Sequence, residues 1–457
     1  MASEALRFFA PAAWVNGAWA ADVVLCAGAN GAWSEIICGA SAEVQGGAQR
    51  LPGPVLPGLV NGHSHAFQRA MAGLAERSAS VQDDFWSWRD RMYSAANRIS
   101  PEQLEAIAAF LYSELLAAGY TQVCEFHYLH NAPDGSAYAD PAEMSLALVR
   151  AAQRTGIGLT LLPTLYMRSG FAAKGLREDQ KRFASTPESV LRIARGVRGQ
   201  AGESGRITCG VALHSVRAVD ESAMLEVASA AGKSMPVHIH IAEQQLEVDD
   251  CIARHGRRPV EWLLDKIPVN ERWNLVHATH CTPAELEGVR HRGASIVVCP
   301  STEANLGDGV FDLARWMGQS GSWSIGSDSH VTRSWQEELR LLEYSQRLTL
   351  RQRNVAARAA LCESSAAALF QGALDGGAAA AGAPLAGLAP GQRADFAVID
   401  CESPSLLGVP SSHLLDALVF SSPEARFSEV FVAGRQVQRS GPELRPAFVR
   451  AMAALWS

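Results

Sequence analysis

Residues 58–68, with the sequence GLVNGHSHAFQ, decide the fold and locate the candidate site. The apolar run 56–60 predicts a short strand, and His63 and His65 follow it, separated by one residue. Side chains alternate between the two faces of a strand, so residues i and i+2 point the same way. The two imidazoles therefore converge at the carboxyl end of a strand, where they suit a borderline metal such as zinc. An isolated His-x-His pair is equally compatible with two hydrogen-bonded histidines beside a turn, and the rest of the chain decides between these alternatives.

Length and composition indicate a large globular protein. The 457 residues exceed what one small domain needs, although barrels of about 250 residues or more often form a single domain. Hydrophobic residues make up 48% of the chain, which supports a large core and argues against disorder. The net charge of −7 and the pI of about 6.0 argue against a nucleic-acid partner, because such proteins are usually basic.

Cysteine usage and hydropathy indicate the compartment. The nine cysteines are scattered without C-x-x-C spacing, as is typical of reduced cytoplasmic proteins. The first residues show no basic region followed by an apolar segment, and no uninterrupted apolar run reaches about 18 residues. We therefore expect a cytoplasmic protein with no membrane partner, and we further expect a homodimer.

The two ends of the chain contain short strand candidates. At the amino end they are separated by the hairpin dipeptides Asn16-Gly17 and Asn30-Gly31, and at the carboxyl end they include residues 393–400 and 429–432. An Ala/Gly-rich stretch, residues 376–384, separates this tail from the preceding sequence. We predict that residues 1–57 and 385–457 pair into one small β-sandwich domain.

Strands alternate with helices in the central part of the chain. A helix is expected at 101–118, with Ser100 as its N-cap and Pro101 at its first position. Eight strand candidates are 56–60, 122–128, 158–166, 207–214, 237–241, 273–277, 295–299 and 323–327. This alternation predicts an α/β fold, a (β/α)8 TIM-like barrel over residues 58–375, with its active site at the carboxyl ends of the strands.

Histidine or aspartate follows five of these strands. One zinc ion can be bound by His63, His65, His240 and Asp328, because a single metal with three or four such ligands keeps a position for water. Glu243 lies three residues after His240, within reach for moving protons, and His277 can polarise the reacting centre. A structural role for His277, as a hydrogen-bond partner of another site residue, stays open.

The lysines bear on the number of metal ions. A two-metal site usually needs a bridging carboxylate or a carbamylated lysine, whereas the lysines avoid the strand ends and the fourth strand ends in His214. We therefore expect one zinc ion per chain.

At these motifs the chain resembles the amidohydrolase superfamily over nearly its whole length. The resemblance is carried by residues 57–65, by His240-x-x-Glu243, by His277, by Ser327-Asp328 and by residues 388–396. The His-x-x-Glu pair after the fifth strand is similar to the deaminase branch, whose members attack C=N carbons and release ammonia.

Within that branch the chain most resembles the formimidoylglutamate deiminase family, through residues 63–73, 85–89, 125–128, 212–218 and 326–330. The resemblance implies zinc-dependent hydrolysis of N-formimino-L-glutamate to N-formyl-L-glutamate and ammonia, a step of histidine degradation. It implies that the zinc ligands are His63, His65, His240 and Asp328, and that the catalytic acid–base residues are Glu243, His277 and Asp328. It implies that the substrate-binding residues are Gln68, Arg89, Tyr128, His214 and Arg217.

Two other functions remain open at this point. A dicarboxylate substrate suits the two guanidinium groups of Arg89 and Arg217, although Arg89 alone is equally compatible with a surface cation. A deaminase acting on a purine-like heterocycle would instead need a pocket lined by aromatic and amide groups. A non-catalytic binding relative would normally have lost metal ligands, whereas all four are present here.

Overall fold

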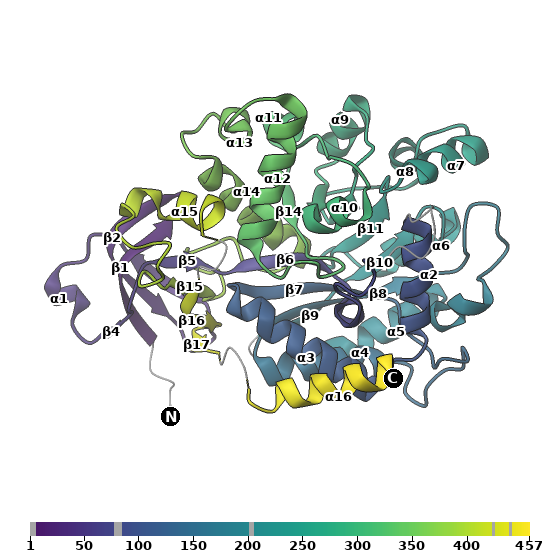
Figure 1. The fold of residues 1–457 in the computed structure, drawn as a ribbon, viewed down its shortest axis with the longest axis horizontal. Helices are drawn as coiled ribbons and strands as arrows, with labels where there is room; N and C mark the ends of the chain where they lie inside the picture. The colour runs from purple at the N-terminus through teal and green to yellow at the C-terminus, as the bar shows by residue number, and fades with distance from the viewer. Residues whose placement is uncertain (1–5, 77–84, 201–204, 423–425, 438–440) are drawn as a thin grey trace.

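The computed structural model describes residues 6–76, 85–200, 205–422, 426–437 and 441–457, and they form two sheets surrounded by helices (Figure 1). The larger sheet is parallel and follows the order β14-β13-β12-β11-β10-β8-β7-β6, with β9 paired to β8. Its strands are β6 (Leu59–Ser64), β7 (Tyr120–His127), β8 (Gly158–Leu165), β9 (Ile207–Cys209), β10 (Val211–Ser215), β11 (Val237–Ile241), β12 (Trp273–His277), β13 (Ser295–Val298) and β14 (Trp323–Ile325).

The larger sheet curls into a nearly closed barrel, because a parallel bridge between Ser64 and Asp328 joins the end of β6 to the chain beyond β14. Most positions on these strands are buried, as expected where helices cover the outer face and side chains fill the interior. The predicted (β/α)8 barrel is therefore confirmed.

Helices alternate with the barrel strands. The helix predicted at 101–118 is α3 (Pro101–Ala117), where Ser100 and Gln103 form a capping box and Pro101 is the first helical residue. The other helices around the barrel are α2 (Phe85–Ala96), α4 (Glu143–Thr155), α5 (Pro187–Arg198), α6 (Glu221–Ala230), α7 (Gln245–His255), α8 (Pro259–Lys266), α9 (Pro283–His291), α10 (Pro300–Leu306), α11 (Leu313–Gly318), α12 (Trp335–Leu350), α13 (Val355–Ala359) and α14 (Ser365–Ala381). None of the described helices has the length and apolar character that crossing a membrane requires.

The second sheet combines strands from both ends of the chain, as predicted. Its order is β17-β16-β15-β5-β1-β2-β3, with β4 paired to β1. Its strands are β1 (Leu6–Val15), β2 (Ala18–Ala27), β3 (Trp33–Ile37), β4 (Gln49–Arg50), β5 (Val55–Pro57), β15 (Phe396–Ile399), β16 (Phe427–Val432) and β17 (Arg435–Gln436), and the short helix α1 (Ala42–Gln45) follows β3.

Aromatic packing joins the two ends within this sheet. The rings of Phe396 and Phe431 stack with their centroids 4.3 Å apart, and Phe8 from the amino end packs edge-on against both at 5.2 Å. The turn between β1 and β2 uses Asn16 and Gly17 with positive φ angles, as the hairpin dipeptide predicts.

The run 56–60, predicted as one strand, is divided between the two sheets. Pro57 ends β5 in the second sheet, and Leu59 starts β6 in the barrel. Gly58 lies between them, where an added Cβ would clash with the side chain of Thr121. The chain therefore passes from one sheet to the other through a single residue that cannot carry a side chain.

The Ala/Gly-rich stretch 376–384, which precedes the carboxyl-terminal tail, is mostly helical. Residues up to Ala381 belong to α14, which packs on the barrel. An added Cβ at Gly376 would clash with the backbone of Trp323, and one at Gly377 would press on Val60. The small residues here allow a helix to approach the strands closely, and do not form a linker.

The carboxyl-terminal helix α16 (Leu444–Trp456) lies along α3, in the lower part of Figure 1. Phe448 stacks on Phe110 with centroids 4.4 Å apart, and the indole nitrogen of Trp456 donates to the carbonyl oxygen of Ala70 at 3.0 Å. This part of the segment 385–457 thus packs on the barrel, outside the second sheet. The division at residues 57, 375 and 385 stays a proposal, based on which sheet each strand joins. The short helix α15 (Leu414–Phe420) packs against α12 and α14.

Candidate active site

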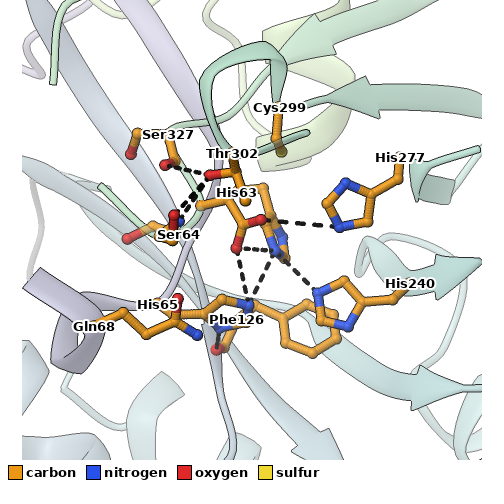
Figure 2. A network of polar contacts seen from close by, with 12 residues as sticks. His63, Ser64, His65, Gln68, Phe126, His240, His277, Cys299, Thr302 and Ser327 are labelled. Atoms are coloured by element: carbon orange, nitrogen blue, oxygen red, sulfur yellow. Dashed lines mark hydrogen bonds and ion pairs between the residues drawn. The ribbon is translucent and has the colours of Figure 1, made fainter. Parts of the chain in front are cut away.

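Three histidine side chains converge at the carboxyl ends of the barrel strands, and Figure 2 shows His63, His65 and His240 pointing toward one another. The Nε2 atom of His63 lies 3.2 Å from that of His65 and 3.0 Å from that of His240. The Oδ1 atom of Asp328 lies 3.5 Å from His63 Nε2 and 3.3 Å from His65 Nε2. The structure therefore brings together all four side chains predicted as metal ligands.

Neighbouring groups orient two of these rings. His65 Nδ1 lies 2.7 Å from the carbonyl oxygen of Phe126, an arrangement in which Nδ1 donates its proton and Nε2 keeps a free lone pair. The ring of His240 stacks on that of Phe126 with centroids 4.2 Å apart. The first contact directs Nε2 of His65 toward the centre of the cluster, and the second fixes the plane of the His240 ring.

The donor set fits one small cation. Ligand atoms about 2.0–2.1 Å from a tetrahedral zinc ion lie roughly 3.3 Å from one another, close to the separations found here. His63, His65 and His240 are buried and offer nitrogen donors that all lie within 4.8 Å of one another. Three imidazoles and one carboxylate are the chemistry that zinc accepts.

Burial and charge place these groups in the protonation states that bind metal. Burial lowers the pKa of His63 to about 3, and it also holds the pKa values of His65 and His240 below their ordinary value. Burial alone would raise the pKa of Asp328, but the hydrogen bond with His63 and the nearby imidazoles hold it below its ordinary value. Neutral imidazoles beside an ionised carboxylate are the ligand form.

The two remaining predicted acid–base residues face this cluster. His277 Nε2 lies 3.6 Å from Glu243 Oε1 and 3.9 Å from Asp328 Oδ2. Burial disfavours the charged imidazole of His277, but the carboxylates of Glu243, Glu303 and Asp328 outweigh it and raise the pKa to about 10. Burial also raises the pKa of Glu243. The site therefore places the imidazole of His277 among three buried carboxyl groups, those of Glu243, Glu303 and Asp328.

The backbone is strained at the same positions. Ala242, His277 and Asp328 have positive φ angles of 51°, 69° and 45°, a region that residues with side chains seldom occupy. Such conformations cost about 1–3 kcal/mol each and persist where the surrounding fold holds them. Their clustering at the strand ends is typical of a functional site.

A cavity opens onto these groups. All five predicted substrate-binding residues line it, namely Gln68, Arg89, Tyr128, His214 and Arg217. The amide of Gln68 donates to the hydroxyl of Tyr128 at 3.3 Å, and the ring of His214 stacks on Tyr166 at 4.0 Å. Arg89 lies on α2, while Arg217 follows β10, so the two guanidinium groups reach the cavity from different elements.

Several lining residues were not anticipated from the sequence. Trp88, Met92 and Tyr93 share α2 with Arg89, and the spacing of three and four residues from Arg89 to Met92 and Tyr93 could have identified them. Leu306 on α10 also lines the cavity, but no local pattern distinguishes it. Glu303, which contacts His277, was missed as well.

A buried polar network holds the end of β6 against the chain after β14. The amide of Asn61 donates to Ser327 Oγ at 2.7 Å, and Ser327 N donates back to Asn61 Oδ1 at 2.9 Å. Ser327 Oγ also lies 3.0 Å from His330 Nδ1, and the hydroxyl of Ser64 donates to Glu125 Oε2 at 2.7 Å. These bonds hold the segments that carry His63, His65 and Asp328.

The amidohydrolase family model matches residues 55–437. Formimidoylglutamate deiminase of Pseudomonas aeruginosa is 48% identical to this chain, with 95% of this chain and 94% of that protein covered. A 5-methylthioadenosine/S-adenosylhomocysteine deaminase of Halobacterium salinarum is 28% identical, with 79% of this chain and 76% of that protein covered.

Solved structures agree with these sequence relatives. The crystal structure of an amidohydrolase from Brucella melitensis superposes with a TM-score of 0.92 at 42% identity, covering 99% of this chain and all (100%) of that one. Three observations lead to one conclusion. They are the overall fold, the convergence of histidines at the ends of the barrel strands, and the match of the family model over most of the chain. This chain belongs to the amidohydrolase family.

Proposed function

We propose that the protein hydrolyses N-formimino-L-glutamate to N-formyl-L-glutamate and ammonia, a step of histidine degradation. The observation that carries this proposal is one cavity lined both by metal-ligand candidates and by two arginines, Arg89 and Arg217. The substrate has a C=N carbon for hydrolysis and two carboxylates for the guanidinium groups. The Pseudomonas aeruginosa relative, at 48% identity, is a formimidoylglutamate deiminase.

The donor chemistry supports one zinc ion bound by His63, His65, His240 and Asp328. When bound, zinc lowers the pKa of a coordinated water to about 7 and so supplies a nucleophile at neutral pH. In the overall reaction, water adds across the C=N bond, the carbon–nitrogen bond to the imino nitrogen breaks, and that nitrogen leaves as ammonia after gaining protons.

The protein's own side chains move those protons. We assign Glu243 to accept a proton from the attacking water and to deliver it to the departing nitrogen, because its carboxylate is buried and faces the cluster. His277 donates from Nε2 toward charge that develops on the reacting centre. Asp328 Oδ2 lies 3.9 Å from His277 Nε2, and we assign it to accept a second proton.

The remaining cavity residues suit the glutamate part of the substrate. Arg217 and Arg89 can each bind a carboxylate through two parallel N–H donors. Gln68, Tyr128 and His214 line the cavity and can form hydrogen bonds with the same part of the substrate. Gln68, Tyr128 and His214 are buried, and Arg89 and Arg217 are half-buried, so charge-assisted contacts here are screened less than at a fully exposed site.

We further propose that the enzyme acts in the cytoplasm as a homodimer. The nine cysteines are all free thiols, as expected in a reducing compartment. Light scattering on the purified protein measures the oligomeric state, and a mass of one chain would contradict the dimer.

An ammonia-release assay tests the function. N-formimino-L-glutamate should be turned over far faster than 5′-methylthioadenosine or a guanidino acid. The purine deserves inclusion because the Halobacterium salinarum relative is a deaminase of that class. Preferential release of ammonia from the purine would overturn the proposal.

A further inference from the structure

A buried carboxylate outside the proposed catalytic set contacts the reacting side of the site. Glu303 lies on α10 with only 4% of its surface exposed, and it does not line the cavity. Its Oε1 atom accepts a hydrogen bond from the backbone N–H of Cys299 at 2.8 Å and lies 3.2 Å from His277 Nδ1. One carboxylate oxygen therefore joins the first turn of α10 to the imidazole of His277.

The two nitrogens of His277 face different partners. Nδ1 faces Glu303, whereas Nε2 faces Glu243 and Asp328 at 3.6 and 3.9 Å. A 180° turn of the ring would replace each nitrogen by a carbon, so that C–H groups would face all three carboxylates. The hydrogen bond from Nδ1 to Glu303 opposes that turn, and it requires that Nδ1 carries a proton.

We propose that Glu303 is a positioning residue, which holds the imidazole of His277 in the orientation that presents Nε2 to the reacting centre. The inference rests on the proposed function in one respect, namely that His277 serves that reaction. Partners that orient an active-site imidazole typically contribute about 10- to 100-fold in activity.

Three variants test this role. Glu303→Met removes both hydrogen bonds at similar volume and should lower kcat about 10- to 100-fold while leaving KM and metal content near those of the parent. Glu303→Gln retains an oxygen in the same place and should restore kcat to within about threefold of the parent. Glu338→Met is the matched control, because Glu338 anchors the same helix through Ser301 N and Oγ at 2.9 and 2.6 Å, and these bonds go to Ser301 rather than to His277.

A double-mutant cycle separates positioning from a general effect on the fold. In a His277→Asn background, Glu303→Met should cause no further loss of kcat, because the ring that it orients is gone. Two outcomes would overturn the inference, because each would show that Glu303 acts through the stability of α10. In the first, the losses of kcat from Glu303→Met and His277→Asn multiply in the double variant. In the second, Glu338→Met loses as much kcat as Glu303→Met.

A second readout does not depend on turnover. The Nδ1–H proton of His277 should give a downfield proton NMR signal that is absent from His277→Asn and Glu303→Met, and shifted in Glu303→Gln because an amide accepts more weakly. If Glu303→Met does not fold, the Glu303→Gln spectrum decides, and an unchanged signal overturns the inference. If the parent fails to release ammonia from N-formimino-L-glutamate, the proposed function fails, while the NMR result still decides whether Glu303 holds the ring.

Discussion

At the scale of the residue, single contacts determine what each imidazole can do. The carbonyl of Phe126 directs the Nε2 lone pair of His65 into the cluster, while carboxylates on both sides of His277 favour its charged form. Identical side chains thus serve as neutral ligand candidates and as a cation within one site. The difference comes from the neighbours of each ring, because burial acts on all of them.

Glu243→Gln should retain the bound metal and lose about 10²- to 10⁴-fold in kcat, since the amide keeps the shape but cannot move a proton. Ammonia release and elemental analysis on the same sample measure both effects. The control is Glu247→Gln, a buried carboxylate four residues on that accepts from Glu243 N at 3.2 Å and does not line the cavity. A near-parental kcat for Glu243→Gln would transfer the proton role to His277 or Asp328.

Arg217→Met should lower kcat/KM for N-formimino-L-glutamate with metal content unchanged. Removing one member of a buried charge pair costs about 2–5 kcal/mol, which corresponds to roughly 30- to 5,000-fold. Formamidine, a truncated substrate without carboxylates, provides the control: it should be a poor substrate for the parent and should lose nothing further in the variant. Equal losses for both substrates would mean that Arg217 supports the fold or the chemistry and does not bind glutamate.

At the scale of the element, close approaches of backbone determine where the helices and strands can lie. Gly58 allows β5 and β6 to belong to different sheets, and Gly376 allows α14 to contact the backbone of β14. Both positions lack room for even one methyl group. The packing of whole elements therefore depends on glycines that have no role in the chemistry.

Gly376→Ala should destabilise the protein by about 1–3 kcal/mol, because the added methyl group meets backbone that cannot move aside. Gly196→Ala is the matched control in an exposed part of α5, where the nearest atom to the new Cβ would be the Ala142 methyl at 3.7 Å. That change should stabilise by about 0.5–1 kcal/mol, since alanine favours the helix. Urea unfolding of both variants measures the two opposite shifts.

The contact between α12 and α10 should make stability depend on pH. Burial raises the pKa of Glu338 to about 8, above the ordinary value of 4.5 that applies in the unfolded chain. The folded state therefore holds a proton that the unfolded state releases, so the stability of the parent should fall as pH rises from about 4.5 to about 8. Glu338→Gln cannot titrate, and its free energy of unfolding should fall less over that window. Parallel pH profiles for parent and variant would contradict the assignment.

At the scale of the whole molecule, the barrel collects groups that are far apart in the chain. His63 and Asp328 lie near opposite ends of the barrel sequence. The bridge between Ser64 and Asp328 nevertheless closes the barrel beside them. The carboxyl-terminal helix α16 joins this frame through the stacking of Phe448 on Phe110, and Phe8 of the amino end packs on Phe396 and Phe431 within the second sheet. Closure of the barrel is what places a complete ligand set around one point.

The active enzyme should contain one metal equivalent per chain. Chelation should abolish ammonia release, and one equivalent of zinc should restore it, because the Nε2 atoms of His63 and His65, with His240 beside them, converge with Asp328 Oδ1 around one point. Elemental analysis after gel filtration measures the stoichiometry. Two tightly bound equivalents in the active enzyme would contradict a single-metal site.

The barrel and most of the site were predictable from the sequence because their signals are local. Apolar runs of strand length recur between helical stretches, and β11 and β12 occupy the predicted residues. His-x-His after a strand places two side chains on one face at any position in any fold. The ligand candidates, Glu243 and His277 therefore followed from the strand ends, together with the rule that parallel strands end at one face of a barrel. The acid–base role of Asp328 and the substrate-binding set followed from the family resemblance.

Only the tertiary structure decided the features that depend on long-range contacts. Gly58 divides an apolar run that looks continuous, because Thr121 fills the space beside it. The glycines of α14 resemble a linker until Trp323 and Val60 are placed against them. Glu303 resembles any helical glutamate, and its contact with His277 arises because β12 and α10 meet at the same end of the barrel. Strand periodicity can be recognised from neighbouring residues. These contacts, in contrast, join residues that are far apart in the chain, so they leave no local pattern.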